Sequence, residues 1–233
     1  MDAPVPLPPL REFARLTREL RFANRFFLSP GPAALVEWVV SYALRHKRRV
    51  FAAGRRLYRA RKHELHQERP YSRREIGAPP PMLSGQGRIN PVGVPYLYLA
   101  SDAQTAVAEA RPWIGCKVTV GEFRMVHAVE VVNLSRRRFL RPVRAGRDEE
   151  EAWKRLISSL FSTPFDPRDD TAYVPTQYLA ERLKREGFGG ILYDSALRGE
   201  GYNVALFAPE TARATRCSVV TVSAIGYRIH RTA

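Results

Sequence analysis

The sequence PYLYLASDAQTAVAEARP, residues 95–112, carries the clearest structural signal in the chain. Its first six residues alternate in character with the period of two that is typical of a strand. Because successive side chains of a strand point to opposite faces, we expect two separate environments. Tyr96, Tyr98 and Ala100 should share one face, and Leu97 and Leu99 the other.

A short helix should follow this strand directly. Ser101-Asp102-Ala103-Gln104 has the pattern of a capping box, in which a hydroxyl at the N-cap is followed three residues later by an amide. Pro112 should stop the helix, because proline lacks the backbone N–H that continuation needs. The stretch therefore predicts a strand–helix unit with Glu109 in the helix.

The remaining pattern predicts strands and helices without a regular alternation. We expect further strands at residues 117–123, 125–133, 190–193 and 203–207, and helices at residues 152–161 and 176–185. Gly187 stands where a left-handed cap would end the last helix. Irregular mixing of this kind favours an α+β fold over a doubly wound sheet.

The first fifty residues differ from the rest and predict two helices. Apolar residues recur near helical spacing, then Ser29-Pro30-Gly31-Pro32 interrupts, and a second apolar helix follows. The apolar positions are Leu10, Phe13, Leu16, Leu20 and Phe26, then Leu35, Val36, Val39, Val40, Ala43 and Leu44. We expect residues 1–50 to form an N-terminal helical extension and residues 51–233 to form the main domain.

The chain of 233 residues is strongly basic, with 38 Lys and Arg against 23 Asp and Glu and a net charge of +15. Residues 45–74 hold twelve Lys and Arg against Glu64 and Glu68, which gives +10 of that total. Such a run could meet nucleic acid or an acidic partner, or form a solvated, arginine-rich helix face. Charge alone does not choose, but aromatic residues are not interleaved as in a single-strand binder, so direct nucleic-acid binding is not expected.

Compartment and membrane signals point to the cytoplasm. Cys116 and Cys217 lack a partner motif, which argues against a disulfide scaffold or a cysteine-rich zinc site and fits a reducing cytosol. The most apolar stretch, residues 33–44, is too short to span a bilayer and contains Glu37. The first nine residues lack the features of a secretory signal. We expect a cytoplasmic protein without a membrane segment.

Several common catalytic signatures are missing from the sequence. Gly85-Gln86-Gly87 does not continue as a dinucleotide fingerprint, and no P-loop occurs. His63 and His66 have no evident third ligand, so we expect a solvated helix face and no metal site. Ser195 has neither a nearby histidine motif nor a Gly-x-Ser-x-Gly context.

Four separated motifs, in this order, resemble the RES family, which is named for its arginine, glutamate and serine. The motifs are Gly87-Arg88-Ile89-Asn90-Pro91, Leu97-Tyr98-Leu99-Ala100, residues 105–112 (TAVAEARP) and Tyr193-Asp194-Ser195. The resemblance covers roughly residues 51–207 and implies that residues 51–233 form a catalytic RES domain. It implies an ADP-ribosyltransferase-like fold, with a split mixed β-sheet and surrounding helices. It further implies a toxin that depletes NAD⁺ and an Xre-type helix-turn-helix antitoxin as partner.

Carried over residue by residue, the resemblance implies a site of Arg88, Tyr98, Glu109 and Ser195. Departure of nicotinamide builds positive charge on the ribose, which the carboxylate of Glu109 would oppose. The guanidinium of Arg88 suits a diphosphate, the ring of Tyr98 could stack on nicotinamide, and Ser195 could orient the carboxylate or a ribose hydroxyl. Secondary candidates for substrate contact or support are Arg59, Arg61, Arg111 and Asn203.

Each main residue also has an ordinary structural interpretation. Arg88 could hold its loop by bonding carbonyls, Tyr98 could be core, and Glu109 could pair with a surface arginine such as Arg111. Ser195 could belong to an ordinary turn. We favour the collective interpretation, because all four occur in the order that the resemblance requires.

The resulting prediction is a toxin that degrades NAD⁺, with water or phosphate accepting the ADP-ribose. NAD⁺ is the substrate, and no cofactor or metal is required. A mono-ADP-ribosyltransferase acting on a protein and a non-catalytic nucleic-acid-binding module are the two alternatives. The basic run is expected to face an acidic surface of the antitoxin or a second copy in a homo-oligomer.

Overall fold

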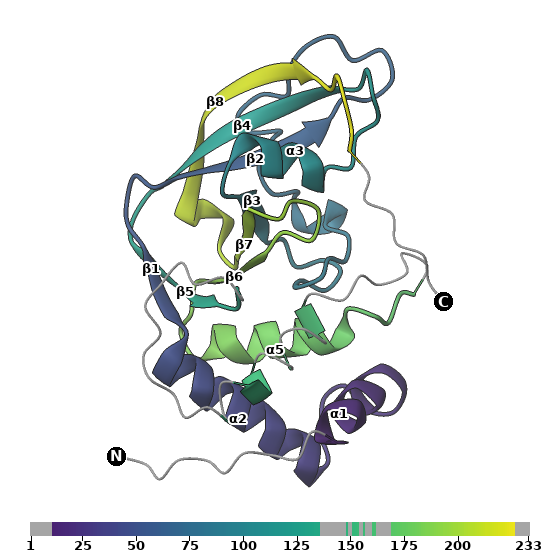
Figure 1. Cartoon of the computed structure of the whole chain (residues 1–233), viewed down its shortest axis with the longest axis vertical. Coiled ribbons are helices and arrows are strands. Elements are labelled where there is room, and N and C mark those ends of the chain that lie inside the picture. Colours follow the sequence, from purple (N-terminus) through teal and green to yellow (C-terminus); the bar gives the residue numbers. More distant parts are fainter. Residues whose placement is uncertain are drawn as a thin grey trace.

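Eight strands form one mixed sheet in the computed structural model, which describes residues 11–135, 148, 151–153, 156, 160–161 and 169–226 (Figure 1). Their order across the sheet is β1-β5-β6-β7-β3-β2-β4-β8. The strands are β1 (Arg48–Phe51), β2 (Arg56–Lys62), β3 (Leu97–Ala100), β4 (Lys117–Met125), β5 (Val129–Asn133), β6 (Gly190–Asp194), β7 (Tyr202–Leu206) and β8 (Ala212–Thr221). Only β5 and β6 run parallel; the other neighbours are antiparallel.

The sheet is nearly divided between β3 and β2. These two strands pair at a single position, Tyr58 opposite Ala100, whereas β2 pairs with β4 over seven residues. One half therefore consists of β1, β5, β6, β7 and β3, and the other of β2, β4 and β8. The mixed, split sheet confirms the predicted α+β class.

Helices cover one face of the five-stranded half. They are α1 (Arg11–Phe22), α2 (Pro30–His46) and α5 (Val174–Arg185), which lie together at one end of the molecule in Figure 1. Their apolar sides pack with Val132, Ile191 and Ala205 of the sheet into one buried cluster. Elsewhere in the described part of the chain lie α3 (Ala103–Glu109), the 3-10 turns Pro81–Leu83 and Pro209–Thr211, and helical residues at 151–153 and 156.

The two N-terminal helices agree with the sequence prediction, with one correction. Leu16 and Leu20 of α1 and Leu35 and Val36 of α2 are almost fully buried. Phe26 was placed on the apolar side of the first helix, but α1 ends at Phe22 and the Phe26 side chain is 83% exposed. The boundary drawn between residues 50 and 51 passes through β1, and Leu10 lies outside the described residues.

The alternation of β3 is confirmed and separates two cores. Tyr96 and Tyr98 pack with the helical cluster. Leu97 and Leu99 belong to a second cluster that joins the five-stranded half to β2, β4 and β8. Burial on both faces explains why this strand is apolar throughout, apart from the phenol group of Tyr98.

The helix after β3 starts one residue later than the capping-box pattern predicts. Asp102, not Ser101, is the N-cap, and its side chain accepts a hydrogen bond from the backbone N of Thr105. Ser101 instead donates its hydroxyl to Asp102. The helix ends before Pro112, as predicted, and the chain leaves it through Arg111 with a φ of 47°.

Several other predicted elements are confirmed, whereas the helix predicted for the basic run at residues 45–74 is wrong. The strands predicted at residues 117–123, 190–193 and 203–207 are present, and Gly187 ends α5 with a φ of 89°. The strand predicted at residues 125–133 is shorter, because β4 extends to Met125 and β5 begins only at Val129. The structural alternative for this basic run was a solvated helix face. The run instead forms the end of α2, strands β1 and β2, and a loop. Part of the helix predicted at residues 152–161 lies outside the described residues.

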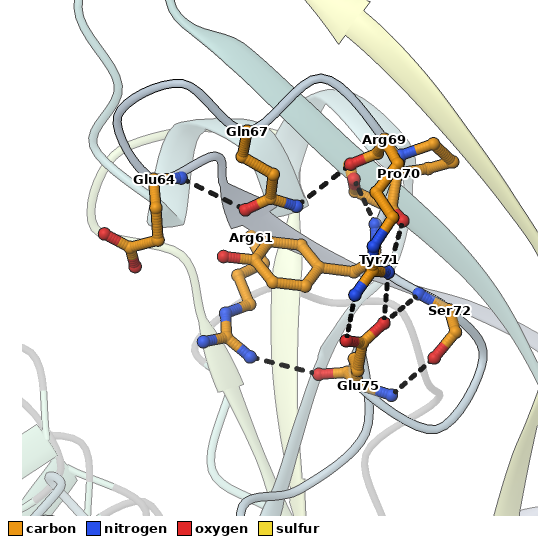
Figure 2. A network of polar contacts seen from close by, with 9 residues as sticks. Arg61, Glu64, Gln67, Arg69, Pro70, Tyr71, Ser72 and Glu75 are labelled. Carbon is orange, nitrogen blue, oxygen red and sulfur yellow. Dashed lines mark hydrogen bonds and ion pairs between the residues drawn. The ribbon is translucent and has the colours of Figure 1, made fainter.

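The loop after β2 is anchored by its own polar contacts (Figure 2). His63, predicted on a solvated helix face, is buried and lies 2.7 Å from Thr119 Oγ1 and 3.0 Å from the carbonyl oxygen of Gln67. The side chain of Arg69 forms two hydrogen bonds with Glu75. Ion pairs of this exposed kind contribute about 0–1 kcal/mol each, so the two apolar clusters dominate stability.

Among the described residues, no helix is long and apolar enough to cross a bilayer.

Candidate active site

A cavity of about 300 Å³ opens where the sheet is split. It lies beside the single β2–β3 pairing point, and α3 forms part of its wall. The residues that line it are Tyr58, Arg59, Ala60, Tyr98, Leu99, Ala100, Ala106, Glu109, Ala110, Tyr193 and Asn203. Four of the candidates from the sequence, Arg59, Tyr98, Glu109 and Asn203, therefore meet in one place.

The carboxylate of Glu109 is exposed yet held by two buried side chains. Ser195 Oγ donates to Glu109 Oε1 at 2.7 Å, and Asn203 Nδ2 donates to the same oxygen at 2.7 Å. Ser195 is 7% exposed and Asn203 is 6% exposed. Hydrogen bonds to a charged acceptor are the stronger kind, so the two donors fix a charged group that solutes can reach.

Ser195 follows β6 and also organises the next turn. Its Oγ accepts hydrogen bonds from the backbone N of Leu197 at 3.3 Å and of Arg198 at 3.1 Å. With both backbone groups donating, the single hydroxyl hydrogen remains for Glu109. Ser195 Oγ therefore stabilises the turn and holds Glu109 at the same time, so the structural and the functional interpretation of this residue are compatible.

Asn203 is fixed by its place in the sheet. It lies in β7 and faces Ala100 of β3 on one side and Tyr193 of β6 on the other. Pairing along both edges restrains the backbone of this strand, and burial restrains the Asn203 side chain. Asn203 therefore presents its amide to Glu109 from a rigid position.

Helix α3 is tied to β7 at its other end. Asp102 Oδ2 accepts hydrogen bonds from the hydroxyls of Ser101 and Thr105, each at 2.7 Å, and Ser101 Oγ accepts from the backbone N of Tyr202. Burial disfavours the charged form of Asp102, but the bonds from Thr105 and Ser101 outweigh it and lower the pKa of the carboxyl. This anchor sets the position of α3, and so of Glu109, relative to Asn203.

Tyr98 is oriented by the loop before β3. Its hydroxyl donates to Asn90 Oδ1 at 2.6 Å and accepts from the backbone N of Ile89 at 3.2 Å. Burial raises the pKa of Tyr98 to about 12. A Cβ on Gly87 would lie 2.4 Å from Asn90 Oδ1 and 2.7 Å from the Tyr98 hydroxyl. The loop therefore needs glycine at this position.

Arg59 supplies positive charge to the cavity. Its guanidinium donates to the carbonyl oxygen of Tyr98 at 3.2 Å, and no carboxylate among the described residues forms an ion pair or hydrogen bond with it. Burial lowers the pKa of Arg59, and the nearby charge of Arg61 adds to the effect. A partly buried guanidinium with no acidic partner favours an anionic ligand.

Arg61 lies outside the cavity lining. Its guanidinium carbon lies 4.1 Å from the centre of the Tyr71 ring, and it donates to the carbonyl oxygen of Glu75 (Figure 2). Of the two arginines that the sequence left open, the structure brings only Arg59 to the cavity.

Arg88 also lies outside the cavity lining. It donates to the carbonyl oxygen of Phe161, and its guanidinium carbon lies 5.9 Å from the Tyr173 ring centre. Its backbone oxygen accepts from the Thr176 hydroxyl. The side chain thus joins its loop to neighbouring segments, which matches its ordinary structural interpretation; its charge still acts on Tyr98 and Tyr193. Arg111 lines a separate groove on the other side of α3.

Sequence reasoning missed two tyrosines of the cavity, Tyr58 and Tyr193. Burial raises the pKa of Tyr193 well above the usual value, and the charges of Tyr98 and Glu109 act in the same direction. Both lie close to candidate residues in the sequence: Tyr58 directly precedes Arg59, and Tyr193 lies two residues before Ser195. This closeness in sequence was the one signal that could have identified them. An aromatic residue in a strand, however, has the same pattern as a residue of the hydrophobic core.

No group of three or more His, Cys, Asp or Glu side chains suited to a metal ion occurs within the described part of the chain.

The fold and the cavity define an α+β protein with a fixed, accessible carboxylate at the split of its sheet. The model of one family, the RES domain, matches residues 56–228, so the chain belongs to the RES-domain family. No curated protein matches the chain.

Among solved structures, the chain is similar to the M. tuberculosis MbcT-MbcA toxin-antitoxin complex, with 15% sequence identity and a TM-score of 0.45. The alignment covers 78% of this chain and 92% of that one.

Proposed function

We propose that this RES-domain protein is the toxin of a toxin–antitoxin pair and cleaves the nicotinamide–ribose bond of NAD⁺. The observation that carries the proposal is the polarity of the cavity. It presents the fixed carboxylate of Glu109 together with the guanidinium of Arg59, which no described carboxylate neutralises. NAD⁺ has the complementary pattern of a cationic nicotinamide riboside and an anionic diphosphate.

Glu109 would act on the ribose. As the bond to nicotinamide breaks, its electron pair leaves with the nicotinamide and positive charge develops on the ribose carbon. A carboxylate that is already positioned by Ser195 and Asn203 stabilises this charge without reorganising. Its exposure lets the ribose approach, and its two donors keep it from turning away.

Arg59 and the tyrosines would bind the rest of the molecule. A guanidinium can contact two phosphate oxygens at once, which lysine cannot copy. The rings of Tyr58, Tyr98 and Tyr193 line the same space. One of them stacked on the cationic nicotinamide would contribute about 0.5–2 kcal/mol, depending on desolvation.

Water or inorganic phosphate is the proposed acceptor of ADP-ribose, and NAD⁺ is a substrate rather than a recycled cofactor. An Xre-type helix-turn-helix antitoxin is the proposed partner, in keeping with the family resemblance. Transfer of ADP-ribose to a protein would use the same carboxylate and cavity, and it differs only in what reaches the ribose from outside.

The direct test is nicotinamide release from NAD⁺ by purified protein, with wild type beside Glu109→Gln and with and without phosphate. We expect release by wild type and a loss of at least about 100-fold in Glu109→Gln, the size of effect that a preorganised electrostatic group supplies. A phosphate requirement would identify the acceptor. Folded wild type that releases no nicotinamide in either condition would refute NAD⁺ breakdown.

A further inference from the structure

A groove of about 920 Å³ lies on the other side of α3 from the Glu109 cavity. Its walls are α3, the turn at residues 197–198 and residues 220–226. Among the described residues, none lines both the groove and the cavity. A ligand in the groove would therefore not occupy the cavity. The apolar side chains of the lining include Val107, Leu197, Val220, Val222 and Ile225.

The charged side chains of the groove are all basic. Arg111 and Arg198 line it, whereas no described aspartate or glutamate does. Neither guanidinium has a carboxylate within ion-pair distance in the part of the chain that the structure describes, and Nε of Arg198 is buried without a hydrogen-bond partner there. Because a partly buried guanidinium without an acidic partner favours an anionic ligand, the groove suits a ligand that carries carboxylates.

The two arginines lie at opposite ends of α3. Burial disfavours the charged form of Asp102, whereas the bonds from Thr105 and Ser101 and the nearby charge of Arg198 lower the pKa of this carboxyl. Arg198 therefore lies near the N-cap of the helix, and Arg111 follows its end. At 1.5 Å per residue, the segment from Asp102 to Arg111 rises by about 13 Å. A single small anion does not span this length.

An extended peptide matches both the length and the lining. Four residues of a strand rise by about 13 Å, and side chains four positions apart point to the same face. Two acidic side chains at this spacing would reach the two ends of α3, and apolar side chains between them would cover Val107 and Leu197. Apolar surface that is covered in this way contributes to binding.

We propose that the groove binds an acidic, partly apolar segment of a partner protein in an extended conformation. Charge complementarity selects this occupant, because a second copy of this chain, with its net charge of +15, would be repelled. A free small anion would pair with one arginine and leave the apolar lining uncovered. The assignment does not rest on the proposed reaction, since the groove shares no described lining residue with the cavity.

The occupant would also contact the turn that orients Glu109. Ser195 Oγ accepts hydrogen bonds from the backbone N of Leu197 at 3.3 Å and of Arg198 at 3.1 Å, and it donates to Glu109 Oε1 at 2.7 Å. The side chains of Leu197 and Arg198 line the groove. A peptide held by Arg198 would therefore restrain the backbone of this turn.

The test is fluorescence anisotropy with short labelled peptides that carry two glutamates four residues apart, with leucine and valine between them. We expect saturable binding to wild type at about 0.15 M salt. Arg198→Gln should weaken binding by about 10- to 150-fold, as for the loss of a hydrogen bond to a charged group. Arg111→Gln should weaken it by about two- to fivefold, because Arg111 is exposed.

Arg213→Gln is the matched control. Arg213 is an exposed arginine of β8 that does not line the groove, so its removal changes the net charge equally. Binding should stay within about 1.5-fold of wild type, because salt screens distant charges. On the peptide side, adjacent glutamates should bind more weakly than glutamates four residues apart, and glutamine in both positions should abolish binding.

Several results would overturn the proposal. They are a wild type that binds none of the acidic peptides, equal binding of the glutamine peptide, and an Arg213→Gln variant weakened as much as Arg198→Gln, which would indicate a diffuse basic surface. Displacement of the peptide by an equal concentration of inorganic phosphate would assign a small-anion site instead.

Hydrogen exchange on the wild type locates the bound peptide without any variant. The backbone amides of Leu197 and Arg198 should exchange at least about threefold more slowly when the peptide is bound, because the restrained turn opens less often. Unchanged exchange of both amides at saturating peptide would place the peptide elsewhere and contradict the proposal. None of these readouts depends on NAD⁺ cleavage.

Discussion

Glu109 combines accessibility with fixation. Its side chain is exposed, whereas the two side chains that donate to it are almost fully buried. An exposed glutamate on a short helix would ordinarily sample several rotamers, so the two hydrogen bonds remove freedom that substrate binding would otherwise have to remove. The arrangement therefore has the features of a preorganised reacting group.

Asn203→Asp tests this fixation at a single residue. The new carboxyl would face Glu109 across 2.7 Å, and because two carboxylates that close do not both ionise, one pKa rises. We expect nicotinamide release to fall by about 100-fold at pH 7 and to recover partly at lower pH, where a protonated carboxyl can donate as the amide does. Release is measured from pH 5 to 8.

Asn24→Asp is the matched control for this substitution. Its side-chain oxygen caps the backbone N of Phe26 and Phe27 on the α1–α2 loop, and a carboxylate can do the same. This variant should keep the wild-type pH profile. An Asn203→Asp profile parallel to that of wild type would contradict the assigned role of the amide.

Tyr98→Phe tests the burial of a phenol in the cavity wall. The folded pKa of about 12 exceeds the usual tyrosine pKa of about 10, so between these values the folded state keeps a proton that the unfolded state loses. The stability contribution is complete below pH 10 and decreases by about 2–3 kcal/mol as the pH approaches 12. Tyr193, whose pKa burial also raises, lowers the stability of both proteins at alkaline pH. The decrease between pH 9 and 12, measured by urea unfolding, should therefore be smaller in the variant by the contribution of Tyr98. An equally steep alkaline decrease in both proteins would refute it.

The candidate site was predictable only in part at this scale. Ser195 and Asn203 contact Glu109 in space, but they lie 86 and 94 residues after it in the sequence. Only the family resemblance could therefore group these residues. The sequence could not decide between Arg59 and Arg61, because their side chains differ only in which loop or strand lies beside them. The motif Tyr193-Asp194-Ser195 contains Tyr193, but no role was predicted for this residue, because a cavity wall and a core face have the same periodicity.

At the scale of elements, the position of α3 matters most. Seven residues long, it is held at its start by Asp102 and Thr105 and at its end by the bonds of Glu109. A helix this short has little stability of its own. Its position therefore depends on these anchors and on close packing against the turn before β7.

Gly201→Ala probes that packing. A Cβ at this position would lie 2.1 Å from Oγ1 of Thr105, which is fully buried. We expect the free energy of unfolding to fall by about 1–3 kcal/mol, the range for overpacking a tight contact. Gly85→Ala, where nothing lies within 4 Å of the new Cβ, should change it by less than about 0.5 kcal/mol. Equal urea midpoints for the two variants would contradict the proposed role of the contact.

Elements buried on both faces or with clear ends were predictable, and others were not. The alternation of β3 predicted its two buried faces correctly, and the glycine after α5 predicted the end of that helix correctly. Each pattern depends only on the local sequence. Strand β2 carries Arg56, Arg59 and Arg61, since it borders a cavity and a polar loop rather than a uniform core. Strand β8 has exposed residues on both faces at its end, which removes the expected alternation.

At the scale of the whole molecule, the candidate cavity meets the helical cluster through Tyr98 and Tyr193, which line the cavity and pack against that cluster. Helices α1, α2 and α5 occupy one end of the molecule, and α3 lies with β2, β4 and β8 toward the other (Figure 1). The N-terminal helices share a core with α5 and the five-stranded half of the sheet. Their removal would expose this core, so we expect a chain lacking residues 1–50 to lose its cooperative thermal transition. A truncated chain that unfolds with the wild-type midpoint would show that the helices are dispensable.

The most direct test of the central claim compares NAD⁺ cleavage by wild type, Arg59→Gln and Arg61→Gln. Arg59 lines the cavity without an acidic partner, whereas Arg61 contacts Tyr71 and Glu75 in the neighbouring loop. If the cavity binds the diphosphate of NAD⁺, Arg59→Gln should lower kcat/KM for nicotinamide release by about 30- to 150-fold, as expected for a lost charge-assisted contact of about 2–3 kcal/mol. Arg61→Gln should remain within about threefold of wild type. Equal activity of Arg59→Gln and wild type would contradict the account.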